Sequence, residues 1–216
     1  MTDYIAPDYN RVALITIDVQ RDCTLPGAPF EIPGTFEMLP NMKKLVQAFR
    51  AIQKPIIHVV RLYLRDGSNA DACRRGIIEL GTCILAPQSD GAELMEELKP
   101  EPGIRLDSTK LLRGELQTIG SHEWIMYKPR WGAFYKTPLE KHLHALDINT
   151  IVVCGCNFPN CPRTTVYEAS ERDFKIVFVT DAVSRTYKRG LQELKNIGVA
   201  LIKTSECFRA IEIYRD

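Results

Sequence analysis

Cys161 stands at the junction between a predicted strand and a predicted helix, where a thiol can serve as a nucleophile. The apolar, β-branched run from Thr150 to Val153 predicts a buried strand, and a polar turn leads from its end to Cys161. Pro162 suits the first turn of a helix, where its missing N–H costs nothing. Backbone N–H groups at a helix start lower the pKa of a thiol and can hold an oxyanion. This stretch alone is also compatible with a buried, unreactive cysteine.

Two further residues with the right chemistry follow predicted strands in the same way. Asp18 comes directly after the apolar run Val12 to Ile17, and Lys128 follows the short strand Trp124 to Tyr127. The carboxyl ends of parallel strands share one edge of a sheet, so we expect Asp18, Lys128 and Cys161 to converge. A carboxylate can take a thiol proton, an ammonium favours both anions, and a thiolate attacks carbonyl carbon. The alternative for Asp18 is a carboxylate that only caps a turn.

The elements that would position these residues alternate between strand and helix along the chain. Buried-strand patterns number six and occur at 12–17, 56–60, 124–127, 150–153, 176–180 and 199–203. Amphipathic patterns between them predict helices, of which Met38 to Gln53 is the best formed. Residues 104–120 leave two alternatives, a hairpin-like excursion or a helix around 111–116. We predict an α/β fold over a single domain, residues 1–216, with a doubly wound, mostly parallel six-stranded sheet and helices on both faces.

Composition narrows the class of protein. The 216 residues carry 28 basic and 27 acidic side chains, a net charge of +1, which predicts neither a nucleic-acid nor a membrane partner. No apolar run approaches the roughly 18 residues of a membrane span, and the N-terminal stretch lacks the apolar core of a signal peptide. Seven cysteines without a disulfide-scaffold spacing indicate reduced thiols in the cytoplasm. The four histidines form no zinc-binding pattern, so no metal or other cofactor is expected.

Four segments together make the sequence similar to the isochorismatase-like cysteine hydrolases, which include nicotinamidases, N-carbamoylsarcosine amidohydrolases, ureidoacrylate hydrolases and biuret hydrolases. The resemblance covers nearly the whole chain. The segments are Asp18-Val19-Gln20, Gly91 to Leu94, Lys128 through Phe134 to Thr137 and Leu139, and Gly155 to Cys161 with Thr165 and Ala169.

The resemblance implies a role for each member of the trio. Asp18 would be the general base, Cys161 the nucleophile and Lys128 the residue that orients and supports both. It also implies a cis peptide bond at Cys156–Asn157 and an oxyanion hole made of the backbone N–H groups of Asn157 and Cys161. The expected reaction is hydrolysis of a C–N bond in a small amide or ureide, by a homo-oligomer of two to eight chains.

The resemblance also bears on metal and substrate. Metal-binding nicotinamidases carry Asp-x-His after the second strand, whereas the region from His58 to Asp66 here lacks it, so His58 is expected to be a packed histidine. We expect the substrate to contact residues on the loops beyond the strands, namely Gln20, Arg130, Trp131, Phe134, Phe158 and Arg163. Four arginines follow predicted strands, and at least one is expected to bind an anionic group of the substrate; they are Arg61, Arg65, Arg130 and Arg163.

Three other functions remain open at this point. One is an isochorismatase-type hydrolase, and another is an inactive family member that acts as a binding or scaffold protein. The last is a thiol-redox protein that uses Cys154, Cys156 and Cys161, although the chain has no Cys-x-x-Cys motif there.

Overall fold

A single seven-stranded sheet forms the centre of the computed structural model, which describes residues 3–213; the ends of the predicted domain, residues 1–2 and 214–216, lie outside it. The strand order is β3-β4-β2-β1-β5-β6-β7, and every neighbouring pair is parallel except β3 and β4. The strands are β1 (Val12–Ile17), β2 (Ile56–Val60), β3 (Gln117–Gly120), β4 (Glu123–Tyr127), β5 (Thr150–Gly155), β6 (Lys175–Val183) and β7 (Ala200–Ile202). The predicted α/β class and mostly parallel sheet are confirmed.

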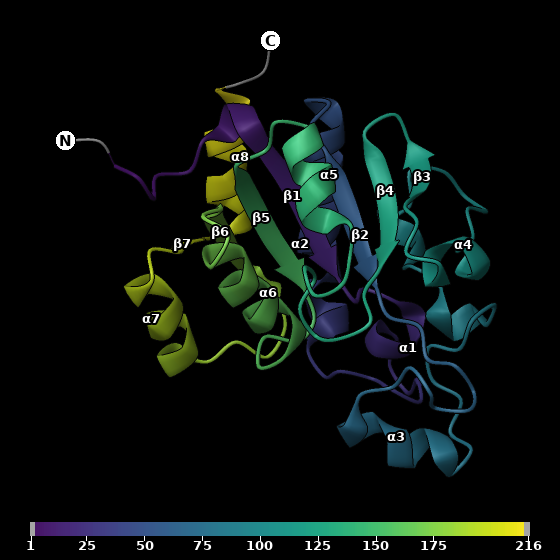
Figure 1. Cartoon of the computed structure of the whole chain (residues 1–216). Coiled ribbons are helices and arrows are strands. Elements are labelled where there is room, and N and C mark those ends of the chain that lie inside the picture. Colours follow the sequence, from purple (N-terminus) through teal and green to yellow (C-terminus); the bar gives the residue numbers. More distant parts are fainter. Residues whose placement is uncertain (1–2, 214–216) are drawn as a thin grey trace.

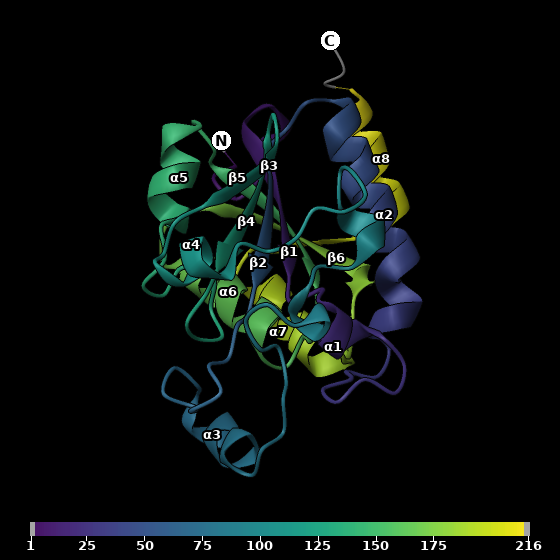
Figure 2. The ribbon, with the colours of Figure 1, turned by 90° about the vertical axis from the view of Figure 1, so that its right-hand side faces the viewer.

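Helices cover both faces of this sheet (Figure 1). Turned by 90°, the molecule shows α2 and α8 on one face and α5 and α6 on the other (Figure 2). The helices are α1 (Arg21–Thr24), α2 (Thr35–Ala51), α3 (Ala72–Glu79), α4 (Ser108–Leu112), α5 (Leu139–Ala145), α6 (Cys161–Ser170), α7 (Lys188–Asn196) and α8 (Thr204–Glu212). Within residues 3–213 no helix is long and apolar enough to cross a membrane.

The seventh strand, β3, was not among the six predicted strands. It lies in residues 104–120, for which the sequence left a hairpin-like excursion and a helix as alternatives. Residues 104–120 form both the short helix α4 and the edge strand β3, which pairs antiparallel with β4. Its side chains are only partly buried or exposed, so its sequence lacks the apolar run that marks the central strands.

The two strands at the centre of the sheet, β1 and β5, are buried along their whole length because helices cover both of their faces. The chain runs from β1 outward to β2 on one side, and β5 continues to β6 on the other. The order of strands therefore reverses between β1 and β5, and ligand sites of open α/β sheets lie at such a point.

The region between β2 and β3 has a weak sequence pattern. Its later part contributes Leu94, Leu98 and Leu111 to the main core, whereas its earlier part, residues 63–86, forms an excursion with a small buried cluster of its own. It carries α3, which stands apart from the sheet at the end where α1 also lies (Figure 2). Only Ile78 of α3 is buried. Whether copies of the chain associate, as the resemblance implies, stays a prediction.

Candidate active site

The backbone hydrogen bonds of the sheet continue for one residue beyond β1 and β4, and they set the starting points of the site. The N–H of Asp18 donates to the carbonyl of Val59 at 2.9 Å, and that of Lys128 donates to Val60 at 3.0 Å. Asp18 then turns the chain away from β1 with a φ of +53°, in the left-handed region that aspartate tolerates better than most residues. These hydrogen bonds bring the carboxyl ends of β1, β2 and β4 level with one another.

Lys128 connects the other two members of the predicted trio. Its Nζ lies 2.9 Å from Oδ2 of Asp18 and 3.2 Å from Sγ of Cys161. The lysine and aspartate side chains are both buried, while Cys161 is partly exposed as the first residue of α6. The second carboxylate oxygen of Asp18, Oδ1, is buried and has no hydrogen-bond partner within residues 3–213. The structure thus brings the three predicted residues together and leaves one acceptor free.

The electrostatics of this group favour a proton on sulfur and a charge on nitrogen. Burial and the Asp18 carboxylate raise the pKa of the Cys161 thiol, and Lys128 only partly opposes them. For Lys128 burial works against the charge, but Asp18 and Cys161 outweigh it, so the pKa of Lys128 is raised. These pKa shifts favour a protonated thiol beside a lysine ammonium, with Oδ1 of Asp18 left as an unused acceptor.

The loop between β5 and α6 carries two backbone donors beside the thiol. Its first peptide bond, Cys156–Asn157, is cis, at the position that the resemblance implies. Within the described part of the chain, neither the N–H of Asn157 nor that of Cys161 has a hydrogen-bond acceptor. Both residues line the same pocket, and the partial positive charge at the start of the ten-residue helix α6 adds to the second donor.

Gly155 allows this loop to approach β1 closely. Its φ is +123°, and a Cβ at this position would lie 2.2 Å from the carbonyl oxygen of Ile17. Cys156 then donates its N–H to that same carbonyl oxygen at 2.9 Å. A residue with a side chain would therefore push β5 and its loop away from Asp18.

A pocket opens beside the trio, at the carboxyl ends of the central strands. Its polar wall holds the trio, Asn157 and Asn160, and the remaining wall is apolar or guanidinium. The lining residues are Asp18, Cys23, Phe30, Ile32, Arg61, Tyr63, Arg74, Leu85, Lys128, Trp131, Cys156, Asn157, Asn160 and Cys161.

Only one of the six residues predicted to contact substrate, Trp131, lines this pocket. Gln20 is fully buried and bonds the backbone of Arg61 through both ends of its amide, so it braces a strand end. Phe134 is buried against Phe174, and Phe158 packs on Phe178 in the core. These three side chains therefore lie in the core and not in the pocket lining, because each has packing or hydrogen-bond partners there.

Arg130 and Arg163, the two arginines among the six residues predicted to contact substrate, also lie outside the pocket lining. Arg163 pairs with Glu193 of α7. Arg130 donates to backbone carbonyls, one of them of Asn69. Arg65 is exposed and lines a different hollow. Of the four arginines named from the sequence, Arg61 is the one that reaches the pocket.

The sequence reasoning missed Arg74 and Asp71, which come from the excursion rather than from a strand end. Arg74 lines the pocket, and Asp71 accepts a hydrogen bond from Arg61 at 2.8 Å. The adjacent basic residues Arg74 and Arg75 could have indicated an anion site. Because they are far in sequence from any predicted strand end, the sequence alone did not connect them with the trio.

Of the other thiols in the redox hypothesis, the structure places Cys156 near Cys161 but not Cys154. Cys154 lies in β5 near Cys207 and is not part of the pocket lining, whereas Cys23 and Cys156 line the pocket beside Cys161. Burial raises the pKa of Cys154, and a hydrogen bond to Cys156 together with burial raises the pKa of Cys23. No cation opposes these two pKa shifts, whereas Lys128 partly opposes the shift in the pKa of Cys161, so Cys154 and Cys23 are the poorer nucleophiles.

His58 is the packed histidine that the sequence indicates. It is buried in β2, with Nδ1 2.8 Å from Thr16 Oγ1 and Nε2 2.7 Å from Glu123 Oε1. Among residues 3–213, no group of three or more histidine, cysteine, aspartate or glutamate side chains could hold a metal ion.

Comparison with known proteins agrees with the fold. The family model for the isochorismatase domain matches residues 12–206. A probable inactive nicotinamidase of Arabidopsis thaliana is 27% identical, with 90% of this chain and 93% of the relative covered. Ureidoacrylate amidohydrolase RutB of Methylobacterium radiotolerans is 28% identical, with coverage of 93% and 76%. The crystal structure of an isochorismatase family protein from Desulfovibrio vulgaris superimposes with a TM-score of 0.79 at 29% identity, covering 94% of this chain and 98% of that one.

Proposed function

Because the chain belongs to the isochorismatase family, we propose that it is a cysteine-dependent amidohydrolase that cleaves a C–N bond of a small amide, carbamoyl or ureido compound. One observation carries this proposal: a single buried ammonium, Lys128, contacts both Asp18 and Cys161, while Oδ1 of Asp18 is free to accept a proton. The similarity to a ureidoacrylate amidohydrolase supports the reaction type.

In the first step the Cys161 sulfur attacks the carbonyl carbon of the substrate as its proton passes to Asp18. The raised pKa of the thiol means that this proton leaves sulfur during the attack and is not lost beforehand. Lys128 remains an ammonium throughout and stabilises the negative charge that develops on sulfur. Asp18 thus acts as a general base and Lys128 as an electrostatic support.

The carbonyl oxygen becomes an oxyanion in the tetrahedral intermediate. The free N–H groups of Asn157 and Cys161 support an oxyanion hole here, since both line the pocket and neither is used elsewhere in the described chain. Asp18 returns the proton to the leaving nitrogen, the C–N bond breaks, and the acyl group remains on sulfur as a thioester.

Water completes the reaction. Asp18, again a carboxylate, takes a proton from a water molecule, whose oxygen attacks the thioester carbon. The C–S bond then breaks, and the proton held by Asp18 returns to the sulfur of Cys161. The overall reaction consumes one water and releases an amine or ammonia and an acid, with the trio restored.

The Arabidopsis relative, described as inactive, keeps one alternative open, that of a catalytically idle binding protein. The other alternative, an isochorismatase-type reaction, cleaves a vinyl ether and does not need the cysteine. The idle protein would release no ammonia with or without Cys161, and the isochorismatase-type hydrolase would keep its activity when Cys161 is replaced.

The test is ammonia release from a panel of small amides and ureides by wild type, Cys161→Ser and Cys83→Ser. We expect Cys161→Ser to lose turnover by several orders of magnitude, and Cys83→Ser, which alters an exposed thiol, to match wild type. Intact-protein mass spectrometry of a rapidly acid-quenched reaction should show the acyl group on wild type and on Cys83→Ser, but not on Cys161→Ser. Near-normal turnover by Cys161→Ser would contradict the mechanism.

A further inference from the structure

The excursion forms one wall of the pocket, and one positive charge on this wall, that of Arg74, has no carboxylate partner among residues 3–213. Asp18 offsets Lys128, and Asp71 offsets Arg61 at 2.8 Å. Arg74 lines the same pocket but forms no ion pair with any carboxylate among residues 3–213, and its guanidinium instead lies over the ring of Phe30, 4.8 Å from the centroid. A half-buried guanidinium that faces a pocket without a partner is suited to an anionic ligand.

Arg61 offers a second donor to the same space. Its guanidinium is buried, and it donates from Nη1 to the carbonyl of Lys128 and from Nη2 to Asp71, both at 2.8 Å. Its Nε is also buried and has no hydrogen-bond partner in the described chain. Buried polar groups in folded proteins nearly always have a partner, so the unpaired Nε of a residue that lines the pocket is a donor suited to a ligand.

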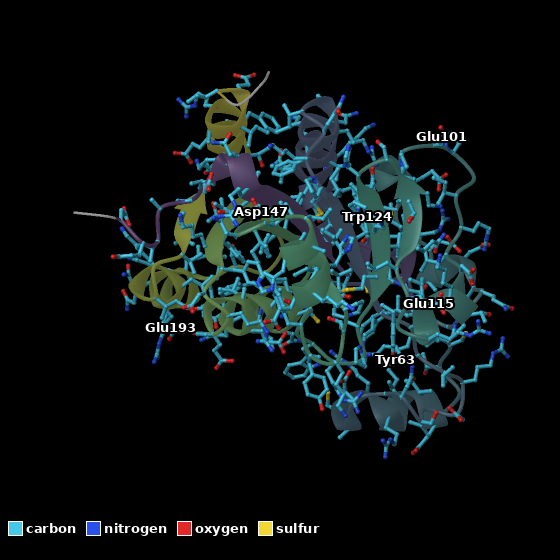
Figure 3. The ribbon with its side chains drawn as sticks, turned by 45° about the horizontal axis from the view of Figure 1, so that its top comes forward. Tyr63, Glu101, Glu115, Trp124, Asp147 and Glu193 are labelled. Atoms are coloured by element: carbon cyan, nitrogen blue, oxygen red, sulfur yellow. The ribbon has the colours of Figure 1, made fainter. Side chains whose placement is uncertain are left out.

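Asp71 holds the guanidinium of Arg61 through its side chain and the backbone of Arg74 through its carbonyl. Besides Arg61, it accepts a hydrogen bond from the hydroxyl of Tyr63, which lies between the sheet and α3 (Figure 3). Asp71 precedes α3, and its carbonyl accepts the backbone N–H of Arg74 at 2.8 Å. Since Arg61 is bonded to the carbonyl of Lys128, one chain of contacts connects Arg74 to the residue that holds the thiol.

We propose that Arg74, together with Nε of Arg61, binds a carboxylate on the substrate and so selects small amides or ureides that carry an acid group. That the bound anion is a substrate rests on the proposed function; that the pocket binds an anion does not. Phe30, Ile32 and Leu85 line the same pocket and supply an apolar wall for the short segment between the acid and the scissile amide.

The test measures binding without turnover, by titration calorimetry on the Cys161→Ser protein. The probes are three matched pairs in which an acid replaces one amide: malonamate and malonamide, succinamate and succinamide, glutaramate and glutaramide. We expect at least one acid to bind about tenfold or more tightly than its diamide. Addition of Arg74→Ala should abolish most of that preference, and Arg75→Ala should preserve it, because Arg75 is the exposed neighbour on the same helix and does not line the pocket.

Absence of an acid preference in all three pairs overturns the proposal, as does a preference that survives Arg74→Ala. The two proposals can fail separately. If acids are preferred but Cys161→Ser retains the turnover of wild type, the anion site stands and the proposed function falls. If Cys161 is essential for turnover but no acid is preferred, the proposed function stands and the anion site falls.

Discussion

The Nζ of Lys128 lies 3.2 Å from the Sγ of Cys161, although β2 and β1 stand between the strands that precede these two residues. Oδ2 of Asp18, the residue after β1, lies 2.9 Å from the same ammonium. The three side chains therefore form one charge-coupled unit, and their effects on catalysis should not add.

The first prediction concerns that unit. Asp18→Asn removes the acceptor of the thiol proton and should lower kcat/KM roughly 10²–10⁴-fold. The double variant Asp18→Asn/Cys161→Ser should have the same kcat/KM as Cys161→Ser alone. Once the nucleophile is removed, the base has no proton to accept, so its removal costs nothing more. Steady-state kinetics on all three variants provide the check, and multiplicative losses would show that Asp18 and Cys161 act independently.

The second prediction concerns the pH dependence of Cys161 alkylation. Because burial and Asp18 raise the pKa of the thiol above its ordinary value of 9.0, the thiolate fraction in the empty site is small at neutral pH. The rate of modification by iodoacetamide, located by peptide mass spectrometry, should therefore keep rising from pH 6 to pH 9. A plateau near neutrality would reveal a stable thiolate–ammonium pair instead.

The third prediction concerns Gly155. An alanine there would adopt an unfavourable positive φ and place its Cβ 2.2 Å from the Ile17 carbonyl oxygen. We expect Gly155→Ala to lower the free energy of unfolding by at least about 2 kcal/mol in urea denaturation. Gly76→Ala is the matched control, since a Cβ at Gly76, inside α3, would meet nothing within 4 Å. Equal stability of the two variants would contradict the close approach of β5 to β1.

The fourth prediction concerns stability in acid. Burial lowers the pKa of His58 below 6.5, and its Nε2 faces the Glu123 carboxylate, which Arg50 also holds. A histidine whose pKa is lower in the folded state than in the unfolded state stabilises the fold at pH values above its pKa in the unfolded state. This stabilisation is lost as the pH falls, because the unfolded state then binds the proton first. The free energy of unfolding should therefore drop below pH 6.5, by up to about 1.4 kcal/mol per pH unit for one such group.

Variants at two histidines separate the contributions to this acid sensitivity. Burial also lowers the pKa of His142, which is only partly buried, so it adds a smaller slope in the same range. Denaturation at pH 7.5 and 5.5 should show most of the slope removed in His58→Gln and most of it retained in His142→Gln. The reverse result would mean that His58 is protonated in the folded protein.

The fifth prediction concerns metal removal. Both ring nitrogens of His58 are engaged, by Thr16 and Glu123, so this histidine is not available as a ligand beside the pocket. Activity should survive exhaustive dialysis against a chelator, measured as ammonia release before and after. Loss of activity that added Zn²⁺ or Mn²⁺ restores would point to ligands that the side chains adopt only when a metal is present.

The sequence by itself determined the fold class and the trio, because both depend on local patterns. Asp18, Lys128 and Cys161 each stand just beyond an apolar run that is long enough to identify a buried strand. Parallel strands must end at a common edge, so the convergence of these three residues follows without knowledge of the packing. The edge strand β3 escaped prediction because its side chains are only partly buried.

Only the tertiary structure decided which side chains form the rest of the pocket. Phe158 and Arg163 flank the nucleophile in sequence, yet Phe158 packs on Phe178 and Arg163 pairs with Glu193, partners that no local pattern reveals. Arg74 reaches the pocket from an excursion because Asp71, three residues earlier, is bonded to Arg61 at the end of β2. The direction of a side chain depends on long-range partners of this kind, whereas the position of a residue at a strand end is already present in the sequence.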